Sequence, residues 1–305
     1  MHVSVIIPTR NRPDLIGNAV GSVLRNTYPD FDILVVDQSD DDQTAKVVQR
    51  LAADHPALRY LHLNRPGLSG AYNAGVRETR GQLLAFTDDD CVAPPDWVAA
   101  VARAFSDAPA ADILYGQVLL PPALADAQGI VPTLSISKRR YLSQRDGFQI
   151  YGMGANFAAR RELFERIGGF DEALGGGGPL RSSQDFDFQY RVYLAGGTTL
   201  LCPDVQVDHY GLRTSAQWPS TLYAYGVGDG AFYFKHVRCG DLLALRLLLN
   251  QLLRLGAREV LSSLRIRQRA SKMVYLRACL VGIRESLRYE IDAGKRLYRL
   301  GVPAA

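Results

Sequence analysis

The chain has few cysteines, no internal repeat and no long uninterrupted apolar run. Cys91, Cys202, Cys239 and Cys279 are far apart and form no Cys-x-x-Cys pair, so the sequence indicates neither a thiolate zinc site nor a disulfide framework. This cysteine usage fits a reducing, cytoplasmic location. A charged stretch at 10–14 stands where an export signal would have its apolar core, so we expect no secretion.

A strong charge of one sign is also missing, because the formal net charge is only +4 over 305 residues. The balance is uneven along the chain, however. Residues 237–305 hold 14 Lys/Arg and 5 Asp/Glu, which gives +9 and leaves −5 for residues 1–236. Apolar residues make up 47% of the chain, which is enough for a buried core. We therefore expect a folded protein whose two parts have different partners.

Short β-rich runs alternate with longer amphipathic stretches over the first 120 residues. The pattern predicts buried strands at 3–7, 33–36, 58–63, 83–86 and 113–118, and helices at 14–24, 44–53, 69–79 and 97–105. Pro13 and Pro95 lie near helix starts, where a missing N–H costs little. The alternation predicts an α/β fold with a mostly parallel sheet flanked by helices.

The second half of the chain has a less regular pattern after Pro121-Pro122. It predicts helices at 161–167 and 182–194 and short strands at 198–202 and 205–209. Four successive glycines at 175–178 predict a mobile loop. From Asp241 onward the pattern is helical throughout, so we expect a helical C-terminal extension.

Polar clusters follow four of the predicted strands, at residues 8–12, 37–42, 64–70 and 88–90. Ligands of an open parallel sheet bind outside the carboxyl ends of its strands. We therefore expect these four clusters to converge on one site.

Asp88, Asp89 and Asp90 directly follow the apolar run 83–86. Three adjacent carboxylates repel one another, and a bound divalent cation is the simplest compensation. Mg²⁺ binds through one or two carboxylates plus substrate phosphates, at about 2.0–2.1 Å. The triplet therefore indicates Mg²⁺ or Mn²⁺ and a phosphorylated substrate. The alternative is a solvated turn that leads into the helix near Pro95.

Other strand ends offer groups that suit a nucleotide. Asp37 ends a second strand and would present a carboxylate acceptor to a base N–H. Arg10, Arg12 and Arg65 lie in neighbouring loops, and forked guanidinium donors suit a diphosphate. Each arginine taken singly is also consistent with an ordinary surface residue.

With these motifs the sequence resembles the family 2 glycosyltransferases, which have the Rossmann-like, nucleotide-sugar-binding GT-A fold. The matching segments, in order, are Ser4-Val5-Ile6-Ile7-Pro8-Thr9-Arg10-Asn11-Arg12, Ile33-Leu34-Val35-Val36-Asp37, Asn64-x-x-Gly67 with Asn73 and Gly75, and Phe86-Thr87-Asp88-Asp89-Asp90. The resemblance continues through 154–172, 183–187 and 208–209, and so covers roughly residues 3–210. It implies a GT-A domain at 1–236, with a nucleotide-sugar half at 1–120 and an acceptor half at 121–236, followed by a basic amphipathic helical extension at 237–305.

The resemblance also implies which residues bind the nucleotide sugar: Pro8, Thr9, Arg10, Arg12, Asp37, Gly67, Asn73, Asp88 and Asp89. Asp37 would contact the base and Asp88 the ribose, with Asp89 as their neighbour. Asp90 would hold Mg²⁺ or Mn²⁺ against the diphosphate, where the ion acts as a Lewis acid for the leaving nucleotide. His209 would add a metal or diphosphate contact, and a structural histidine is the alternative.

Asp185 matches the catalytic base of the family. It would take a proton from the acceptor hydroxyl as that oxygen attacks the anomeric carbon opposite the nucleotide, which inverts the anomer. Gln184 stands where the family usually has Glu, so one charge of that pair is missing. A carboxylate at a helix start is the alternative for Asp185. The acceptor could be lined by Asn156, Trp218 or the aromatic residues of 223–234, which are equally consistent with a plain core.

The basic C-terminal part predicts an interaction surface. Segments 241–256 and 271–291 are apolar stretches with regularly spaced arginines, which is typical of amphipathic helices that lie on a membrane. Each Lys or Arg near an anionic leaflet contributes about 1 kcal/mol. Arg246 interrupts the first segment, so we expect no transmembrane helix. A helical subdomain or a homodimer interface is the alternative, and the apolar density disfavours nucleic acid.

These observations together predict a metal-dependent, hexosyltransferase-like, inverting enzyme. It would move a sugar from a nucleotide-diphosphate sugar to a lipid-linked or polysaccharide acceptor in cell-surface glycan synthesis, as a peripheral protein on the inner face of the cell membrane. A nucleotidyltransferase is a second hypothesis, but it would want a Gly-rich loop after the first strand, and residues 8–12 contain no glycine. A non-catalytic, membrane-associated scaffold of the same fold is the third.

Overall fold

The computed structural model describes residues 1–265 and 271–303, with side chains at 1–254 and 273–301. By its internal contacts the chain divides into two compact units, which we call unit 1 and unit 2. Unit 1 comprises Met1–Pro66, Gly70–Gly169 and Gln189–Arg213, and unit 2 comprises Gly67–Ser69, Phe170–Phe188 and Thr214–Ala305. The expected division after residue 236 stays a prediction; that position lies two residues before the end of a helix.

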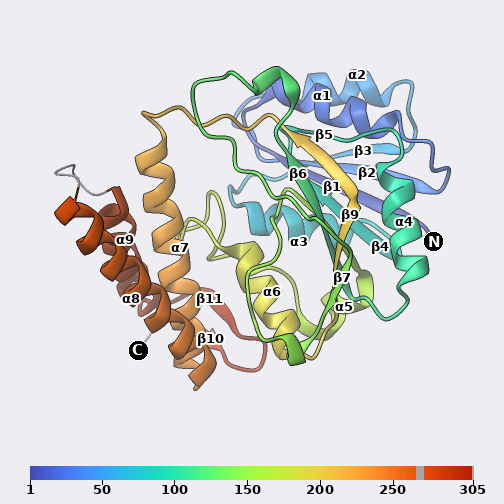
Figure 1. Ribbon diagram of the computed structural model, residues 1–305. Helices are drawn as coiled ribbons and strands as arrows, with labels where there is room; N and C mark the ends of the chain where they lie inside the picture. The colour runs from blue at the N-terminus through green and yellow to red at the C-terminus, as the bar shows by residue number, and fades with distance from the viewer. Residues whose placement is uncertain (266–270, 304–305) are drawn as a thin grey trace. The chain divides into compact units, whose positions relative to one another are not determined.

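Unit 1 is built around a nine-stranded mixed sheet of described residues (Figure 1). Its strands are β1 (Val3–Thr9), β2 (Phe31–Asp37), β3 (Leu58–His62), β4 (Leu83–Thr87), β5 (Cys91–Val92), β6 (Ile113–Leu119), β7 (Arg140–Leu142), β8 (Asn156–Arg160) and β9 (Thr199–His209). Their order is β3-β2-β1-β4-β8-β6-β9-β5, and β7 also pairs with β9. Strands β1 to β4 are mutually parallel, as are β6 and β9, whereas β8 runs antiparallel between β4 and β6. The predicted mostly parallel sheet is confirmed.

Helices and short 3-10 turns connect these strands. They are α1 (Pro13–Leu24), α2 (Gln43–Ala52), α3 (Leu68–Glu78), α4 (Trp97–Asp107), η1 (Pro122–Leu124), η2 (Gln144–Asp146) and α5 (Arg161–Ile167). Helices α1 and α2 pack side by side (Figure 1). Every strand and helix predicted in the first 120 residues is present, with its ends within two residues of the prediction.

The sheet is buried on both faces, which explains the continuous apolar runs of its central strands. Val5 and Ile7 of β1 belong to the main core, together with apolar residues of α1 and α4. Ile6 points to the other face, because successive strand residues alternate. There Gly75 of α3 approaches so closely that a Cβ would fall 2.5 Å from Ile6 Cγ2. A side chain at residue 75 would therefore push this helix off the sheet.

Strand β9 is longer than predicted. The two short strands expected at 198–202 and 205–209 form one strand, Thr199–His209, and the prediction of two was wrong. Its pairing with β6 shifts, because Tyr115 pairs with Leu201 and Gln117 with Gln206, so Pro203 lies in a bulge of β9. Proline has no N–H for the ladder, and the Gln117 side chain instead donates to the Pro203 carbonyl at 2.9 Å. The bulge carries the strand on to His209.

Unit 2 contains the remaining helices and a hairpin. Its elements are the first residues of α6 (Gln184–Leu194), then α7 (Trp218–Arg238), α8 (Leu242–Arg265), α9 (Ser271–Ser286), β10 (Tyr289–Asp292) and β11 (Leu297–Pro303). The expectation of helix throughout from residue 241, and to residue 291, was wrong, because α9 ends at Ser286 and a hairpin follows. The Asp292 carboxylate accepts the N–H groups of Gly294 and Lys295, which stabilises the turn.

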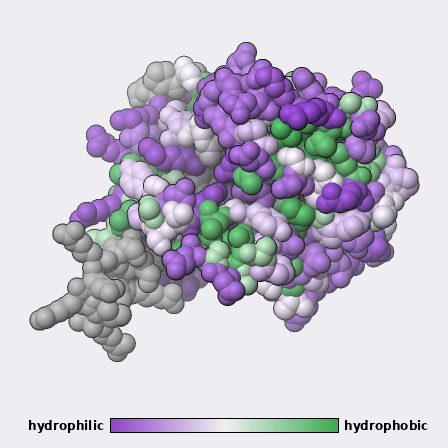
Figure 2. All heavy atoms as spheres, turned by 90° about the horizontal axis from the view of Figure 1, so that it is seen from above, coloured by the Kyte–Doolittle hydropathy of each residue, from purple (hydrophilic) through white to green (hydrophobic). Residues whose placement is uncertain are grey.

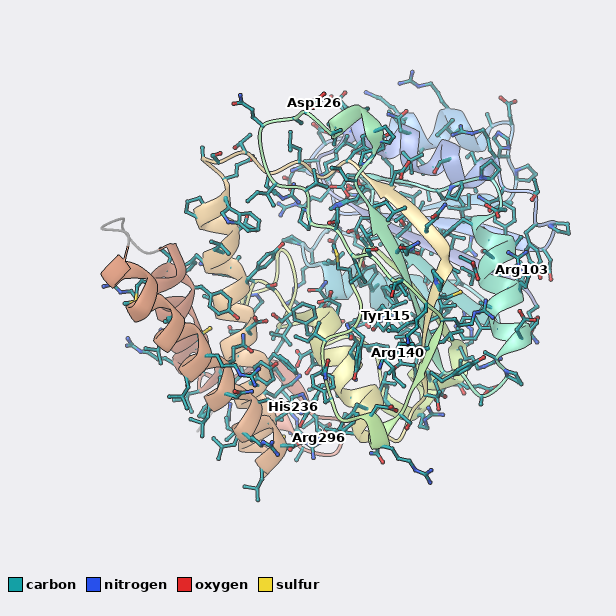
Figure 3. All side chains as sticks on the ribbon, viewed as in Figure 1. Arg103, Tyr115, Asp126, Arg140, His236 and Arg296 are labelled. Carbon is teal, nitrogen blue, oxygen red and sulfur yellow. The ribbon has the colours of Figure 1, made fainter. Side chains whose placement is uncertain are left out.

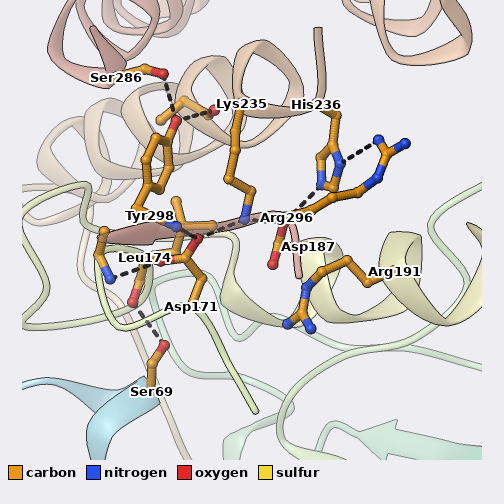
Figure 4. A network of polar contacts seen from close by, with 12 residues as sticks. Ser69, Asp171, Leu174, Asp187, Arg191, Lys235, His236, Ser286, Arg296 and Tyr298 are labelled. Atoms are coloured by element: carbon orange, nitrogen blue, oxygen red, sulfur yellow. Dashed lines mark hydrogen bonds and ion pairs between the residues drawn. The ribbon is translucent and has the colours of Figure 1, made fainter. Parts of the chain in front are cut away.

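A buried network of charged groups holds the hairpin within unit 2 (Figure 4). Lys235 of α7 lies 2.6 Å from both Asp171 and Asp187, and none of the three side chains is exposed. The Tyr298 N–H of β11 donates to Asp171 at 2.9 Å. His236 contacts Asp187 at 2.9 Å, and Arg296 lies beside His236 (Figure 3). The last strand of the chain thus completes this core.

The surface seen in Figure 2 is mostly hydrophilic, with hydrophobic atoms gathered in smaller areas. Within unit 2, helices α7 and α9 pack backbone to backbone. A Cβ on Gly230 would fall 2.1 Å from the Cys279 carbonyl oxygen, and one on Gly282 would fall 2.0 Å from that of Val227. Glycine at both positions allows this approach. Of the helices described, none combines the length and the apolar character that crossing a membrane requires.

Candidate functional site

The acidic triplet lies in the turn between β4 and β5, where the β1 loop reaches it. The Arg12 guanidinium Nη1 donates to Asp89 Oδ1 at 2.7 Å and to Asp90 Oδ2 at 3.0 Å. The Thr9 hydroxyl donates to Asp89 Oδ2 at 2.7 Å. The Tyr72 hydroxyl lies 3.4 Å from Asp88 Oδ1. The predicted convergence of strand ends therefore holds for the β1 loop and the triplet.

His209 joins this cluster from the end of β9. It pairs with Cys91 in the ladder, and its Nε2 lies 3.3 Å from Asp90 Oδ1. Its Nδ1 lies 2.8 Å from the Pro132 carbonyl oxygen, which can only accept, so Nδ1 carries the proton of the neutral ring. Nε2 therefore faces Asp90, and against the effect of burial the contact with this carboxylate raises the pKa of His209. Asp90 and His209, the two predicted metal ligands, thus lie next to each other, and their role as ligands stays a prediction.

Burial and neighbouring charges shift the pKa values of the three carboxyl groups of the triplet in different directions. Burial, and next the charge of Asp90, raises the pKa of Asp88 to about 7. Burial also raises the pKa of Asp89, against the opposing charge of Arg12. Burial opposes ionisation of Asp90 as well, but the contacts with His209 and the charge of Arg12 outweigh it and lower its pKa. Asp90 is therefore the carboxylate most firmly held in its charged form.

Asp37 is buried at the end of β2, and in the register of the sheet it stands opposite Thr9. Its Oδ1 accepts the Ser39 N–H at 2.8 Å and the Ser39 hydroxyl at 2.5 Å, and its Oδ2 accepts the Tyr60 hydroxyl at 2.9 Å. Burial, with the contact to Asp37, raises the pKa of Tyr60. Sequence reasoning missed Tyr60, although it lies two residues before the end of the adjacent strand β3.

Several predicted nucleotide-sugar residues lie outside this cluster of contacts. Arg10 is paired with Asp40 at 3.3 Å instead of with the triplet. Pro8 is paired with Val36 inside the sheet. Asn73 packs closely against Gly169, since a Cβ on Gly169 would fall 2.3 Å from Asn73 Oδ1. Gly67, which has a φ of 144°, belongs to unit 2 by its contacts. Binding roles for these residues stay predictions.

Asp185 lies in the first turn of α6, in unit 2, and its Oδ1 accepts the N–H of Phe186 at 3.0 Å. Two residues just before it have left-handed backbones, with φ of 71° at Arg181 and 68° at Ser183. Both are side-chain-bearing residues, so the turn that introduces Asp185 is strained. The role of Asp185 as base stays a prediction.

Asn156, one of the residues considered for the acceptor, is a buried residue of unit 1. Its Oδ1 accepts the Trp97 indole N–H at 3.0 Å, and its Nδ2 donates to the carbonyls of Gln117 and Val205. Its amide is thus used within the core. Trp218 is half-buried in unit 2 and stays a candidate.

Residues 4–168 match the family model described as Glycosyl transferase family 2, which is more than half of the chain. The chain belongs to glycosyl transferase family 2. Glycosyltransferase AglE of Haloferax volcanii is 26% identical over 183 residues, which is 58% of this chain and 59% of AglE. The GalNAc(5)-diNAcBac-PP-undecaprenol beta-1,3-glucosyltransferase of Campylobacter jejuni is 37% identical over 90 residues, 29% of each chain. The match thus spans 59% of AglE and 29% of the Campylobacter enzyme, less than two thirds of either.

A solved glycosyltransferase structure shows the same fold. Mannosyltransferase PcManGT from Pyrobaculum calidifontis, in complex with GDP-Man and Mn²⁺, has a TM-score of 0.64 at 20% identity, over 92% of this chain and 86% of that one. The fold is therefore GT-A, as the sequence resemblance implied.

The residues of the triplet region fit a divalent cation. Ligand atoms of Asp90, Cys91 and His209 lie within 4.8 Å of one another. Among the described residues Asp90 Oδ1 is buried without a hydrogen-bond partner, and a Cβ on Gly211 would fall 2.4 Å from His209 Nε2, so glycine leaves this space open. Burial raises the pKa of the Cys91 thiol well above its usual value, and hard cations prefer oxygen, so Cys91, which sequence reasoning missed, is a neighbour of the pair.

Proposed function

We propose that the chain is an inverting glycosyltransferase that moves a sugar from a nucleotide-diphosphate sugar to a lipid-linked or polysaccharide acceptor in cell-surface glycan synthesis. The pairing of Asp90 with His209 carries the proposal, because it offers a carboxylate and an imidazole lone pair to a divalent ion at the strand ends. Family membership supports the reaction class. The undecaprenol-linked name of one relative supports the acceptor class.

Each charged group has a separate task in this proposal. Asp90 and His209 would hold Mg²⁺ or Mn²⁺, which supplies charge neutralisation and Lewis acidity for the leaving diphosphate. Arg12 keeps the carboxylates of Asp89 and Asp90 oriented, since one guanidinium nitrogen binds both. Asp37 would accept a base N–H, and Asp88 would contact the ribose. PcManGT, whose complex holds GDP-Man and Mn²⁺, supports this donor class.

Asp185 would act as the general base. It takes the proton of the acceptor hydroxyl while that oxygen forms a bond to the anomeric carbon, and the bond from that carbon to the diphosphate oxygen breaks. The proton moves to the carboxylate and the electron pair leaves with the nucleoside diphosphate. A base in this role must come within about 2.6–3.2 Å of the acceptor oxygen.

A donor panel tests the reaction class. UDP-sugars and GDP-sugars are incubated with the full chain and Mn²⁺, and released nucleoside diphosphate is measured. We expect release with at least one donor, and its loss in Asp90→Ala but not in the matched exposed variant Asp41→Ala. Release of pyrophosphate from a nucleoside triphosphate and a sugar phosphate would favour a nucleotidyltransferase instead. No turnover together with no metal-dependent stabilisation by nucleotide would favour a scaffold.

Helix α8 would rest on an anionic membrane surface. Four leucines line its exposed face: Leu242, Leu245, Leu249 and Leu253. Leu242 and Leu253 are 78% and 69% exposed, and exposed Arg246 and Arg254 flank the stripe. Ala244 and Leu248 are buried on the opposite side. An apolar stripe with flanking cations fits the interface of an anionic leaflet. In this part of the proposal, the protein is cytoplasmic and peripheral, on the inner face of the cell membrane.

Vesicle co-sedimentation tests the membrane surface. The full chain is compared with the variant Leu242→Glu/Leu249→Glu/Leu253→Glu on vesicles with and without phosphatidylserine. We expect binding to anionic vesicles only, with loss in the variant. Equal sedimentation of both proteins contradicts the proposal. Self-association in analytical ultracentrifugation that the variant abolishes would favour the dimer interface instead.

A further inference from the structure

A buried carboxyl group on α7 connects three other segments of unit 2. Asp229 lies within Gly226-Val227-Gly228-Asp229-Gly230. It accepts the hydroxyl of Ser183 at 2.6 Å, the hydroxyl of Tyr275 from α9, and the side-chain amide of Gln251 from α8 at 3.3 Å. One side chain thus joins the two C-terminal helices to the residue that directly precedes α6.

The partners of Asp229 are all neutral. In the part of the chain that the structure describes, no cation is hydrogen-bonded to this carboxyl group, and the nearby titratable groups are Tyr233, Tyr275 and Cys279. Burying a carboxyl group among neutral donors is costly, and an apolar residue would serve packing better. The position therefore holds an acidic group although burial opposes its charged form.

Ser183 is the partner that relates Asp229 to the proposed chemistry. Its left-handed backbone, with φ 68°, is unfavourable for serine and needs support from its surroundings. Its side chain is held by Asp229, and its carbonyl accepts the Asp187 N–H at 2.9 Å, which begins the hydrogen bonding of α6. Gly228 presses on the same turn, since a Cβ there would fall 2.6 Å from the Ser182 carbonyl carbon.

We infer that Asp229 is a positioning residue for Asp185, which it acts on by fixing Ser183 and so the strained turn from which α6 begins. The inference rests on the proposed role of Asp185 as base. The same contacts explain why the Gly226–Gly230 segment contains three glycines. Gly228 admits the turn, and Gly226 and Gly230 bring α7 against α9, so that Tyr275 reaches the same carboxyl group.

Substitutions at both ends of the contact test this inference. Ser183→Ala and Asp229→Ala should each lower kcat for nucleoside diphosphate release about 10–100-fold, the order of loss for a misplaced reacting group, with donor KM within about twofold. Asp229→Asn should keep most of the activity, because its amide oxygen still accepts from Ser183. The double variant Ser183→Ala/Asp229→Ala should be no slower than either single variant, since both remove one contact.

Ser4→Ala is the matched control. Ser4 is buried, and its hydroxyl donates to Asp32 at 2.6 Å at the amino end of β1, so the same kind of contact is lost without effect on kcat. Ser183→Gly removes the hydroxyl while relieving the strain of the left-handed backbone, so it stays folded and should still lose kcat. Losses equal to that of Ser4→Ala, or losses that multiply in the double variant, overturn the inference. A wild-type chain without turnover contradicts the proposed function instead.

Discussion

The Lys235 ammonium lies 2.6 Å from the Asp187 carboxylate, and both side chains are fully buried. Lys235 comes from α7, and Asp187 lies two residues after Asp185 in α6. Asp171 accepts from the same ammonium and from the Tyr298 backbone of β11 (Figure 4). The ion pair therefore links the proposed base helix with the last strand of the chain, and the C-terminal part is structural for unit 2.

Replacing Lys235 by Met should lower the free energy of unfolding by about 3–5 kcal/mol, because two buried carboxyl groups lose their cation. Urea denaturation followed by circular dichroism measures the change. Lys46→Met is the control, since Lys46 forms an exposed pair with Asp42, and it should change stability by less than about 0.5 kcal/mol. Equal effects of the two variants would show that the buried pair is not stabilising.

Arg10 and Arg12 are both predicted from the sequence to bind the nucleotide sugar, but their contacts differ, so we expect their substitutions to change turnover differently. Arg12→Ala removes the guanidinium shared by Asp89 and Asp90, so we expect loss of most turnover and weaker dependence on Mn²⁺. Arg10→Ala removes an exposed pair with Asp40 and should retain most activity. Steady-state kinetics with a Mn²⁺ titration measures both. A larger loss in Arg10→Ala would mean that the donor reorganises this loop.

Tyr60→Phe should raise donor KM with little change in kcat. The substitution removes the hydroxyl that holds Asp37 Oδ2 and leaves the aromatic ring in place. Hydrogen bonds to charged groups contribute about 1.5–3 kcal/mol, so a rise in KM of about tenfold or more is expected. Tyr28→Phe loses an exposed hydroxyl contact with the Met1 carbonyl and should behave as wild type. A fall in kcat at unchanged KM would contradict a base-binding role for Asp37.

His209→Ala should lose metal-dependent nucleotide binding. In the wild type, Mn²⁺ with a nucleoside diphosphate should raise the melting temperature, and a chelator should reverse the rise, because a ligand that binds only the folded state at 100 times its Kd adds about 2.7 kcal/mol. The variant should show no such difference. His55→Ala, at an exposed position, is the control. An undiminished Mn²⁺ effect in His209→Ala would assign the ion to other ligands.

Asp229 should make stability depend on pH. Burial raises its pKa in the folded state despite three hydrogen bonds, whereas the unfolded chain titrates near about 3.9. As pH rises between these two values, the unfolded state loses its proton first, so stability falls with pH and is constant above the folded pKa. Asp229→Asn should lack this slope, so the difference between the unfolding free energies of wild type and variant should change with pH. Parallel curves would mean that the pKa is ordinary.

Local sequence patterns were sufficient for strands β1 to β4 and β6 and for helices α1 to α4. The runs of β1, β2 and β4 are buried on both faces, and each ends in a polar side chain at the edge where ligands bind. Periodicity and burial are properties of a few consecutive residues, so strand ends could be placed within two residues. The acidic triplet and Asp37 followed as candidates from those ends, whereas the family resemblance indicated His209.

The partners of these residues were decided only by the tertiary structure. The strand order brings Tyr60 next to Asp37 and Cys91 next to His209. The geometry of the turns decides that Arg12 pairs with the triplet and that Arg10 pairs with Asp40. The C-terminal hairpin was predicted as helix, because its strands become favourable only when Tyr298 is buried against Asp171. A chain's own pattern determines which elements form, whereas contacts between distant segments depend on the order in which those elements pack.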